Sequence, residues 1–209
     1  MMPLIEKYRV DNLNDIKGQS IAVEEVRNFL RMFPVKKALI LNGPVGTGKT
    51  SMALALAKEN DLELFELNAS DLRNRKSLEA VLKPSLEQQS LFGKKKLILM
   101  DEADGITGSD RGGLPELIAL ISKTKVPIII TSNDIWKKKF SLLRKSCKII
   151  SLKELSDIDV KQIITEVLKK EDKKIKSETI DLIVKGARGD VRAALNDLES
   201  VILLGEENI

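Results

Sequence analysis

The stretch GPVGTGKT, residues 43–50, decides how this 209-residue chain is interpreted. It fits the pattern G-x-x-x-x-G-K-[S/T], in which glycines let the backbone approach phosphate oxygens and the lysine adds a cation. An apolar run at 38–41 precedes the stretch, and a helix-like run at 51–57 follows it. This order is expected of a phosphate-binding loop between a buried strand and a helix.

The loop supplies a first set of candidate ligands for a nucleotide. Lys49 is expected to neutralise the β- and γ-phosphates, and the Thr50 hydroxyl is expected to bind Mg²⁺. The backbone of the whole loop is expected to surround the phosphates. The predicted binding residues here are Gly43, Pro44, Val45, Gly46, Thr47, Gly48, Lys49 and Thr50.

Five short apolar runs are predicted to be strands, and they are continuous rather than alternating, which is typical of parallel strands buried on both faces. A helical pattern such as that at 114–123 lies between successive runs. The alternation predicts an α/β domain with a five-stranded parallel sheet over residues 1–152. The five runs are 38–41, 64–67, 97–100, 127–131 and 147–152.

From about residue 153 the pattern changes to helices alone. Ser156 is the expected N-cap of the first helix, with Asp159 three residues later, and Ser177 starts a second helix. A third helix is expected to begin near Asp190. Three short helices need one another to form a core, so residues 153–209 are predicted to be a small three-helix lid domain.

Composition excludes several classes of protein. The chain has no run of about 18 apolar residues, so no membrane span is expected. The charged N-terminus MMPLIEKYRV does not resemble an export signal, and the single Cys147 cannot form an internal disulfide, so a cytoplasmic protein is expected. The chain has no histidine, so a general base must be a carboxylate. The net charge of +4 does not by itself indicate a nucleic-acid partner.

Polar residues follow two of the predicted strands. Asp101 and Glu102 come directly after the run at 97–100, and Asn133 follows the run at 127–131. Because ligands bind beyond the carboxyl ends of parallel strands, Asp101 is expected to hold Mg²⁺ through water and Glu102 to activate the attacking water. Asn133 is expected to position that water or to sense the γ-phosphate, and the alternative is an asparagine that only forms a turn.

Several further stretches, in the same order along the chain, resemble the AAA+ ATPases and, within them, the clamp-loader (replication factor C) subunits. The resemblance covers nearly the whole chain. Its segments are Glu6-Lys-Tyr-Arg9, Leu67-Asn-Ala-Ser-Asp71, Thr131-Ser-Asn-Asp134 and Gly189-Asp-Val-Arg192-Ala-Ala-Leu-Asn196.

The resemblance implies an ATPase that hydrolyses ATP with Mg²⁺, in a site that a neighbouring subunit completes. It implies that Tyr8 and Arg9 lie at the adenine and that Arg192 reaches the γ-phosphate from the lid. Lys49, Glu102, Asn133 and Arg192 are then the expected catalytic residues. The implied task is to open a sliding clamp and load it onto primer-template DNA during DNA replication, with one large and four small subunits as partners.

Two features are more similar to the large than to the small clamp-loader subunits. Small subunits carry Ser-Arg-Cys, whose arginine enters a neighbour's site, whereas this chain has Lys145-Ser146-Cys147. The segment 104–113 resembles the large subunit's extended loop.

Val10 departs from the proline usual in the family. The chain ends where a collar domain is expected, and it has no N-terminal extension, which favours an archaeal, cytoplasmic form over a eukaryotic, nuclear one.

A DNA contact is expected at the start of the helix at 114–123. Arg111, Gly112 and Gly113 precede this helix, so free N–H groups and one guanidinium are expected to face a DNA phosphate.

Three other functions fit part of the pattern. The letters Asp-Glu-Ala-Asp at 101–104 occur in a class of RNA helicases, but those enzymes need a second sheet domain. Another AAA+ DNA remodeller, such as a replication initiator or a branch-migration motor, shares the phosphate loop. A subunit that binds ATP only as structural glue needs no Glu102, and the intact Lys49, Asp101 and Glu102 disfavour it.

Overall fold

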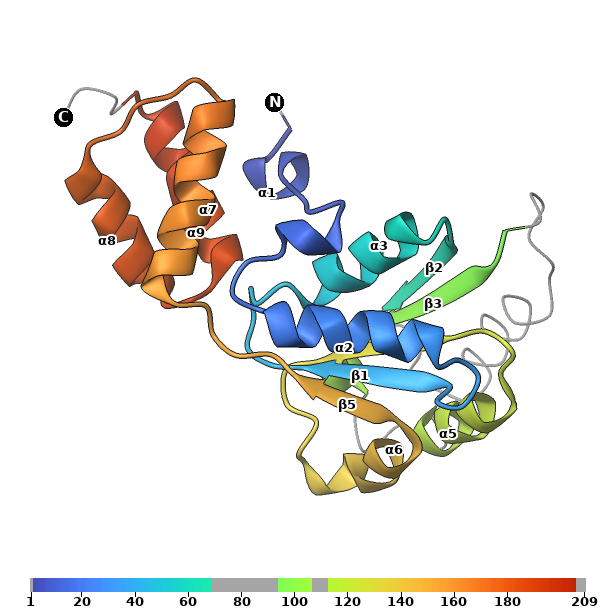
Figure 1. The fold of residues 1–209 in the computed structure, drawn as a ribbon. Helices are drawn as coiled ribbons and strands as arrows, with labels where there is room; N and C mark the ends of the chain where they lie inside the picture. Colours follow the sequence, from blue (N-terminus) through green and yellow to red (C-terminus); the bar gives the residue numbers. More distant parts are fainter. Residues whose placement is uncertain (1, 69–93, 107–112, 206–209) are drawn as a thin grey trace.

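The computed structural model describes residues 2–68, 94–106 and 113–205 (Figure 1). Their centre is a five-stranded parallel sheet in the order β2-β3-β4-β1-β5. This confirms the α/β class and the five predicted strands. The strands are β1 (Ala38–Asn42), β2 (Glu63–Asn68), β3 (Lys96–Asp101), β4 (Ile128–Ser132) and β5 (Lys148–Ser151).

Helices cover both faces of the sheet (Figure 1). Helices α2 (Ser20–Arg31) and α3 (Lys49–Glu59) pack on one face, and α5 (Gly113–Lys123) and α6 (Ser141–Ser146) pack on the other. Successive β1 residues alternate between these two layers, so the whole strand is buried. Strand β2 departs from this pattern. Among the described residues it has a neighbouring strand on only one side, and Phe65 is 36% exposed.

The parallel register brings the carboxyl ends of three strands to one edge. Asn42 of β1 pairs with Ser132 of β4, and Met100 of β3 pairs with Ile130 of β4. The phosphate loop, the acidic pair and Asn133 follow these strands, so they lie at the same edge. Short 3₁₀ helices occur at Leu13–Asp15, Ala103–Gly105 and Lys138–Phe140.

The described residues after β5 form α7 (Asp157–Lys170), α8 (Ser177–Ala187) and α9 (Val191–Leu203), which we call the lid. The predicted capping box is present, since the Ser156 hydroxyl accepts from the Asp159 N–H and the Asp159 carboxylate accepts from the Ser156 N–H. Asp190 is the N-cap of α9, and its carboxylate accepts from the N–H groups of Arg192 and Ala193. The lid helices share a buried apolar cluster of their own.

The N-terminal helix α1 (Leu4–Lys7) belongs to this second cluster. Leu4 is buried among the lid side chains, and α1 lies beside α9 (Figure 1). The Tyr8 hydroxyl donates to Glu171 at the end of α7, and the Lys7 ammonium lies 2.6 Å from the same carboxylate. The first residues therefore pack with the lid cluster, although they precede the sheet in the sequence. Within the described ranges, no helix combines the length and apolar character that crossing a bilayer requires.

Candidate nucleotide-binding site

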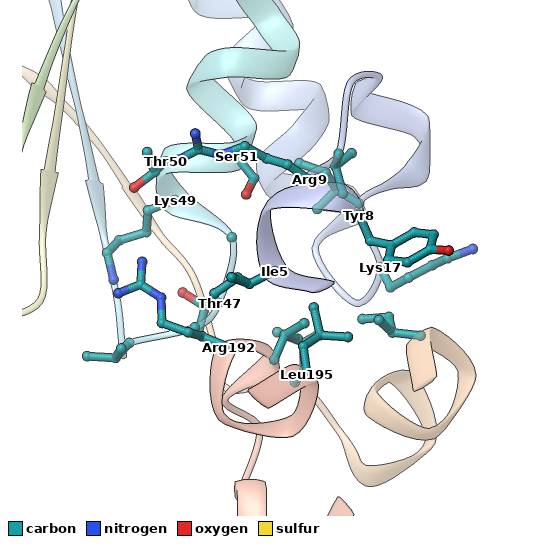
Figure 2. Close-up of a pocket in the computed structure, with 18 of the residues that line it drawn as sticks. Ile5, Tyr8, Arg9, Lys17, Thr47, Lys49, Thr50, Ser51, Arg192 and Leu195 are labelled. Atoms are coloured by element: carbon teal, nitrogen blue, oxygen red, sulfur yellow. The ribbon is translucent and has the colours of Figure 1, made fainter. Parts of the chain in front are cut away.

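A pocket of about 720 Å³ lies at the carboxyl edge of the sheet, between the phosphate loop, the N-terminal segment and the lid. Figure 2 shows Lys49, Thr50 and Arg192 at one end and Tyr8 and Lys17 at the other. The pocket thus has a polar end formed by the loop and a second end formed by α1 and the lid helices.

The phosphate loop has the backbone shape that its glycines allow. Gly46 and Gly48 have φ of +71° and +92°, which side chains with a Cβ rarely adopt. The Thr47 hydroxyl donates to the Pro44 carbonyl at 2.9 Å and closes the turn. Helix α3 begins at Lys49, so its first N–H groups are directed at the pocket, as an anion site requires.

The ammonium of Lys49 is held above this loop by three oxygen acceptors. It donates to the carbonyls of Gly43 and Pro44, both at 2.7 Å, and to Asn133 Oδ1 at 2.8 Å. Burial lowers the pKa of Lys49, and the carboxylates of Asp104 and Asp101 act in the opposite direction. A cation that has lost water contacts in this way gains strongly from a phosphate.

Thr50 and Asp101 form an oxygen-rich pair at the start of α3. The Thr50 hydroxyl lies 3.1 Å from both carboxylate oxygens of Asp101, and the Thr131 hydroxyl also donates to that carboxylate. Hydroxyl and carboxylate oxygens fit Mg²⁺, which keeps waters and binds few protein ligands when phosphates supply the others. The described part of the chain has no cluster of three or more potential metal ligands among its His, Cys, Asp and Glu residues.

Glu102 follows in a backbone conformation that is unusual for a residue with a side chain. Its φ of +56° and ψ of +49° lie in the left-handed region. Its N–H donates to the Thr131 hydroxyl at 3.0 Å, and its side chain is exposed in the pocket. The carboxylate is therefore free of the sheet and can reach a water molecule there.

The lid contacts the phosphate loop directly. The Val191 N–H donates to the Gly46 carbonyl at 3.3 Å, and the Asp190 carboxylate accepts from the N–H groups of Arg192 and Ala193 at 2.8 and 3.1 Å. The exposed Arg192 side chain lines the pocket on the same side as Lys49 (Figure 2). Arg192 is thus brought to the polar end from the far end of the sequence.

The other end of the pocket combines the N-terminal segment with apolar side chains of the lid. Tyr8 and Arg9 line it, as do Ile163 and Val167 of α7 and Leu195 of α9. Burial, followed by the hydrogen bond to Glu171, raises the pKa of the Tyr8 hydroxyl. This end can accept a flat, largely apolar group such as a nucleotide base.

Most of the predicted site residues lie together around this pocket. Val45 to Thr50, Tyr8, Arg9, Asp101, Glu102, Asn133 and Arg192 line it, and the carbonyls of Gly43 and Pro44 hold Lys49 from behind. Arg111, Gly112, the segment 69–71 and the segment 107–112 lie outside the described residues. Gly113 is the first residue of α5.

Sequence reasoning missed the lid side chains that line the second end, and it missed Thr131 and Asp104 as partners of the site. The apolar positions 163 and 167 were visible as one helix face, but that pattern also fits a helix that only packs into a core. Thr131 and Asp104 were visible as polar residues at the strand ends. Their partners depend on the sheet register.

Comparison with known proteins places these features in a family. Residues 39–155 match the model of the ATPase family associated with various cellular activities (AAA). The chain is 39% identical to the replication factor C large subunit of Thermofilum pendens, over 100% of this chain and 52% of that protein. It is 37% identical to that of Methanococcus aeolicus, over 100% and 45%, and 39% identical to that of Sulfurisphaera tokodaii, over 93% and 46%. The chain spans about half the length of the curated relatives it matches. Since the family model covers more than half of its residues, the chain belongs to the AAA family of ATPases.

Proposed function

We propose that this chain is the ATPase and lid part of a clamp-loader large subunit, which hydrolyses ATP while a sliding clamp is opened and loaded onto primer-template DNA. One observation carries the proposal. The phosphate loop, the acidic pair, Asn133 and Arg192 come from four separate parts of the sequence and meet around one pocket. The similarity to archaeal replication factor C large subunits along the chain supports the choice of task.

Each side chain at the polar end has a role that its surroundings support. Lys49 binds the β- and γ-phosphates, and Thr50 with Asp101 holds Mg²⁺, Asp101 through water. When bound there, Mg²⁺ would supply positive charge that offsets the charge developing on the phosphates. Glu102 accepts the proton of the attacking water, and Asn133 positions that water. Arg192 adds positive charge at the γ-phosphate from the lid.

The second end binds the base. Tyr8 and Arg9 lie on the N-terminal side of the adenine, with the apolar side chains of α7 and α9 opposite. Because the lid contacts both ends of the pocket, nucleotide binding sets the position of the lid relative to the sheet. The proposed domains are an α/β unit up to residue 152 and a lid after it. Helix α1 belongs to the first segment but packs on the lid.

The proposed partners are clamp-loader small subunits, the sliding clamp and primer-template DNA. Ser146 stands where small subunits carry their inter-subunit arginine, and its hydroxyl donates to the Leu142 carbonyl at 3.1 Å. The neighbouring Arg144 donates to the carbonyls of Ile135 and Lys137, at 2.7 and 3.1 Å. Arg144 is thus engaged within its own chain. A small subunit therefore supplies the arginine to this chain's site, and Arg111 with the start of α5 is the proposed DNA contact.

The test is a loading assay with the full-length protein, small subunits and clamp. A fluorophore pair across one clamp interface reports opening, and retention of clamp on primed circular DNA reports loading. We expect both signals to require Mg-ATP, and Lys49→Ala to abolish them. If the assembly neither opens nor loads a clamp but moves branched DNA or melts a replication origin, the chain is another AAA+ remodeller.

A further inference from the structure

Asp104 lies behind the site and does not line the pocket. It belongs to the 3₁₀ turn Ala103–Gly105, directly after Glu102. Its carboxylate accepts hydrogen bonds from the Ser132 hydroxyl and from the Asn133 N–H, the latter at 2.9 and 3.0 Å to the two oxygens. Asp104 therefore joins the turn after β3 to the loop after β4.

The contacts of Asp104 lie beyond the last residues of β3 and β4 that are paired through their backbones. The β3–β4 pairing runs only to Met100 and Ile130. Beyond that pair, side chains make the connection, Thr131 to Asp101 and Asp104 to Ser132 and Asn133. Ser132 is fully buried, so it fixes Asp104 from a rigid position.

Two candidate catalytic groups depend on the segments that Asp104 joins. The Asn133 N–H is held by Asp104 while its Oδ1 accepts from Lys49 at 2.8 Å, so the backbone bond sets the direction of the side chain. Glu102 is held in a left-handed conformation by Thr131 and by the Gly105 N–H, which donates to the Glu102 carbonyl at 2.9 Å. Such a conformation persists only when neighbouring contacts enforce it.

We propose that Asp104 is a positioning residue for ATP hydrolysis, which fixes Asn133 and the turn that carries Glu102 without touching the nucleotide. The inference rests on the proposed ATPase function and deepens it. It predicts that loss of Asp104 lowers turnover and leaves nucleotide affinity nearly unchanged, because the phosphate loop keeps its own contacts.

A different role for Asp104 is purely electrostatic, as a negative charge near Lys49. Two substitutions separate the roles. Asp104→Asn removes the charge but keeps an oxygen acceptor for the Asn133 N–H and a polar partner for the Ser132 hydroxyl. Asp104→Ala removes both the charge and the hydrogen bonds. Positioning predicts that only the alanine variant is impaired, whereas a charge effect predicts equal loss in both.

The experiment uses three measurements on these variants. Turnover is measured in the full-length protein assembled with small subunits, and the Kd of Mg-ATP is measured for the same assembly. The 209-residue chain contains one tryptophan, Trp136, three residues after Asn133 and 60% exposed, so the anisotropy of its fluorescence in the isolated chain reports the mobility of the loop after β4. Asp181→Ala is the control, since it removes an exposed carboxylate that contacts Lys161 in the lid.

For Asp104→Ala we expect kcat to fall about 10²-fold, as for a misplacement of about 1 Å, with Kd within about threefold of wild type. The fluorescence anisotropy of Trp136 falls, because the loop after β4 moves more freely. Asp104→Asn keeps most of the turnover, and Asp181→Ala matches wild type in all three measurements. Wild-type kcat and anisotropy in Asp104→Ala, or equal losses in the alanine and asparagine variants, would overturn the proposal.

Ser132→Ala decides the question if Asp104→Ala does not fold, because it removes one of the two donors to Asp104. A lower kcat at unchanged Kd supports positioning, and wild-type kcat overturns it. Failure of the wild-type assembly to bind or hydrolyse Mg-ATP contradicts the proposed ATPase function. That result is distinct from a working enzyme that is indifferent to Asp104.

Discussion

Lys49 and Glu102 differ in how the structure holds them, although both stand at the polar end of one pocket. The Lys49 ammonium is surrounded by three oxygen acceptors and is partly desolvated. The Glu102 side chain is exposed, and only its backbone is fixed. The contacts of Lys49 therefore suit phosphate binding, and those of Glu102 suit proton transfer to and from water.

These roles give the first prediction. Lys49→Ala should weaken Mg-ATP binding by about 10- to 100-fold, because it removes a charged hydrogen-bond donor worth about 1.5–3 kcal/mol. Glu102→Gln should bind Mg-ATP within about threefold of wild type and lose at least about 10²-fold in turnover, since only the general base is changed. Calorimetric titration and phosphate release in the assembled loader measure the two quantities. Equal loss of affinity in both variants would contradict the assignment.

The second prediction concerns Cys147, which is 7% exposed. Burial raises the pKa of its thiol to about 12. Since the thiolate is the reactive form, modification by a neutral thiol reagent should stay slow in the native chain from pH 7 to 9 and become fast in urea. A pKa raised in the folded state means that its stability contribution is complete below the unfolded value of about 8.5 and declines as pH rises towards 12. Fast native labelling at pH 8 would show that the thiol is accessible.

At the scale of elements, the N-terminus of α9 lies in direct contact with the phosphate loop, although the two are far apart in the sequence. A Cβ added at Gly46 would lie 1.8 Å from Asp190 Oδ1 and 2.8 Å from the Asp190 Cα. Position 46 therefore favours glycine for two reasons. The loop needs a positive φ there, and Asp190 leaves no room for a Cβ. Loop and lid are therefore expected to move as coupled bodies.

Gly46→Ala tests this coupling. It should lower stability by about 1–3 kcal/mol, or roughly 2–12 °C in Tm, because it combines a left-handed backbone with a clash against Asp190. Gly48→Ala is the matched control, since Gly48 also has a left-handed φ of +92° but an added Cβ meets no atom within 4 Å. The control should lose less stability than Gly46→Ala, because it carries only the cost of the backbone conformation. Thermal unfolding followed by circular dichroism separates the two, and equal Tm values would mean that lid and loop do not touch in solution.

Arg192 gives the second prediction at this scale. It projects from α9 towards the polar end of the pocket, so ATP is expected to draw the lid towards the sheet through this guanidinium. Arg192→Ala should blunt the change in small-angle scattering that Mg-ATP causes in the wild-type chain. Arg188→Ala is the control, because Arg188 is exposed in the lid but does not line the pocket. An undiminished change in Arg192→Ala would remove the proposed role.

At the scale of the whole molecule, the α6 surface of this chain has no available arginine that could enter the nucleotide pocket of a second copy. Ser146 occupies the position at which the resemblance to small subunits predicts an arginine. Arg144 donates to the Ile135 and Lys137 carbonyls, and its guanidinium lies over the Trp136 ring, 5.4 Å from the centroid. A second copy of the chain placed against the pocket would therefore not complete it from this surface.

The last prediction follows from that surface. The 209-residue chain by itself should bind Mg-ATP and hydrolyse it slowly at every concentration. The full-length protein mixed with Ser-Arg-Cys small subunits should hydrolyse it faster by about 10³–10⁵-fold, the range that a trans arginine gives in other phosphate-loop enzymes. Changing the arginine of the adjacent small subunit to alanine should remove the gain at this site. Hydrolysis by the chain alone that rises steeply with its concentration would show that it completes its own site.

Much of the fold and of the polar end could be predicted from the sequence. The phosphate loop has fixed spacing, the strands are continuous apolar runs, and Ser156 and Asp159 form a local capping signal. Each of these depends on residues a few positions apart, so local physics is enough to specify it. The rule that ligands gather at the carboxyl edge of a parallel sheet then placed Asp101, Glu102 and Asn133 near Lys49.

The remaining features depended on contacts between distant parts of the chain. The sequence does not show that α1 packs on the lid, that α7 and α9 line the second end of the pocket, or that Asp104 holds Asn133. Apolar residues at helical spacing specify a buried face but not which surface covers it, and a carboxylate after a strand does not name its donor. Sheet register and the packing of the lid decided those partners, because both are set by the burial of the whole chain rather than by any local pattern.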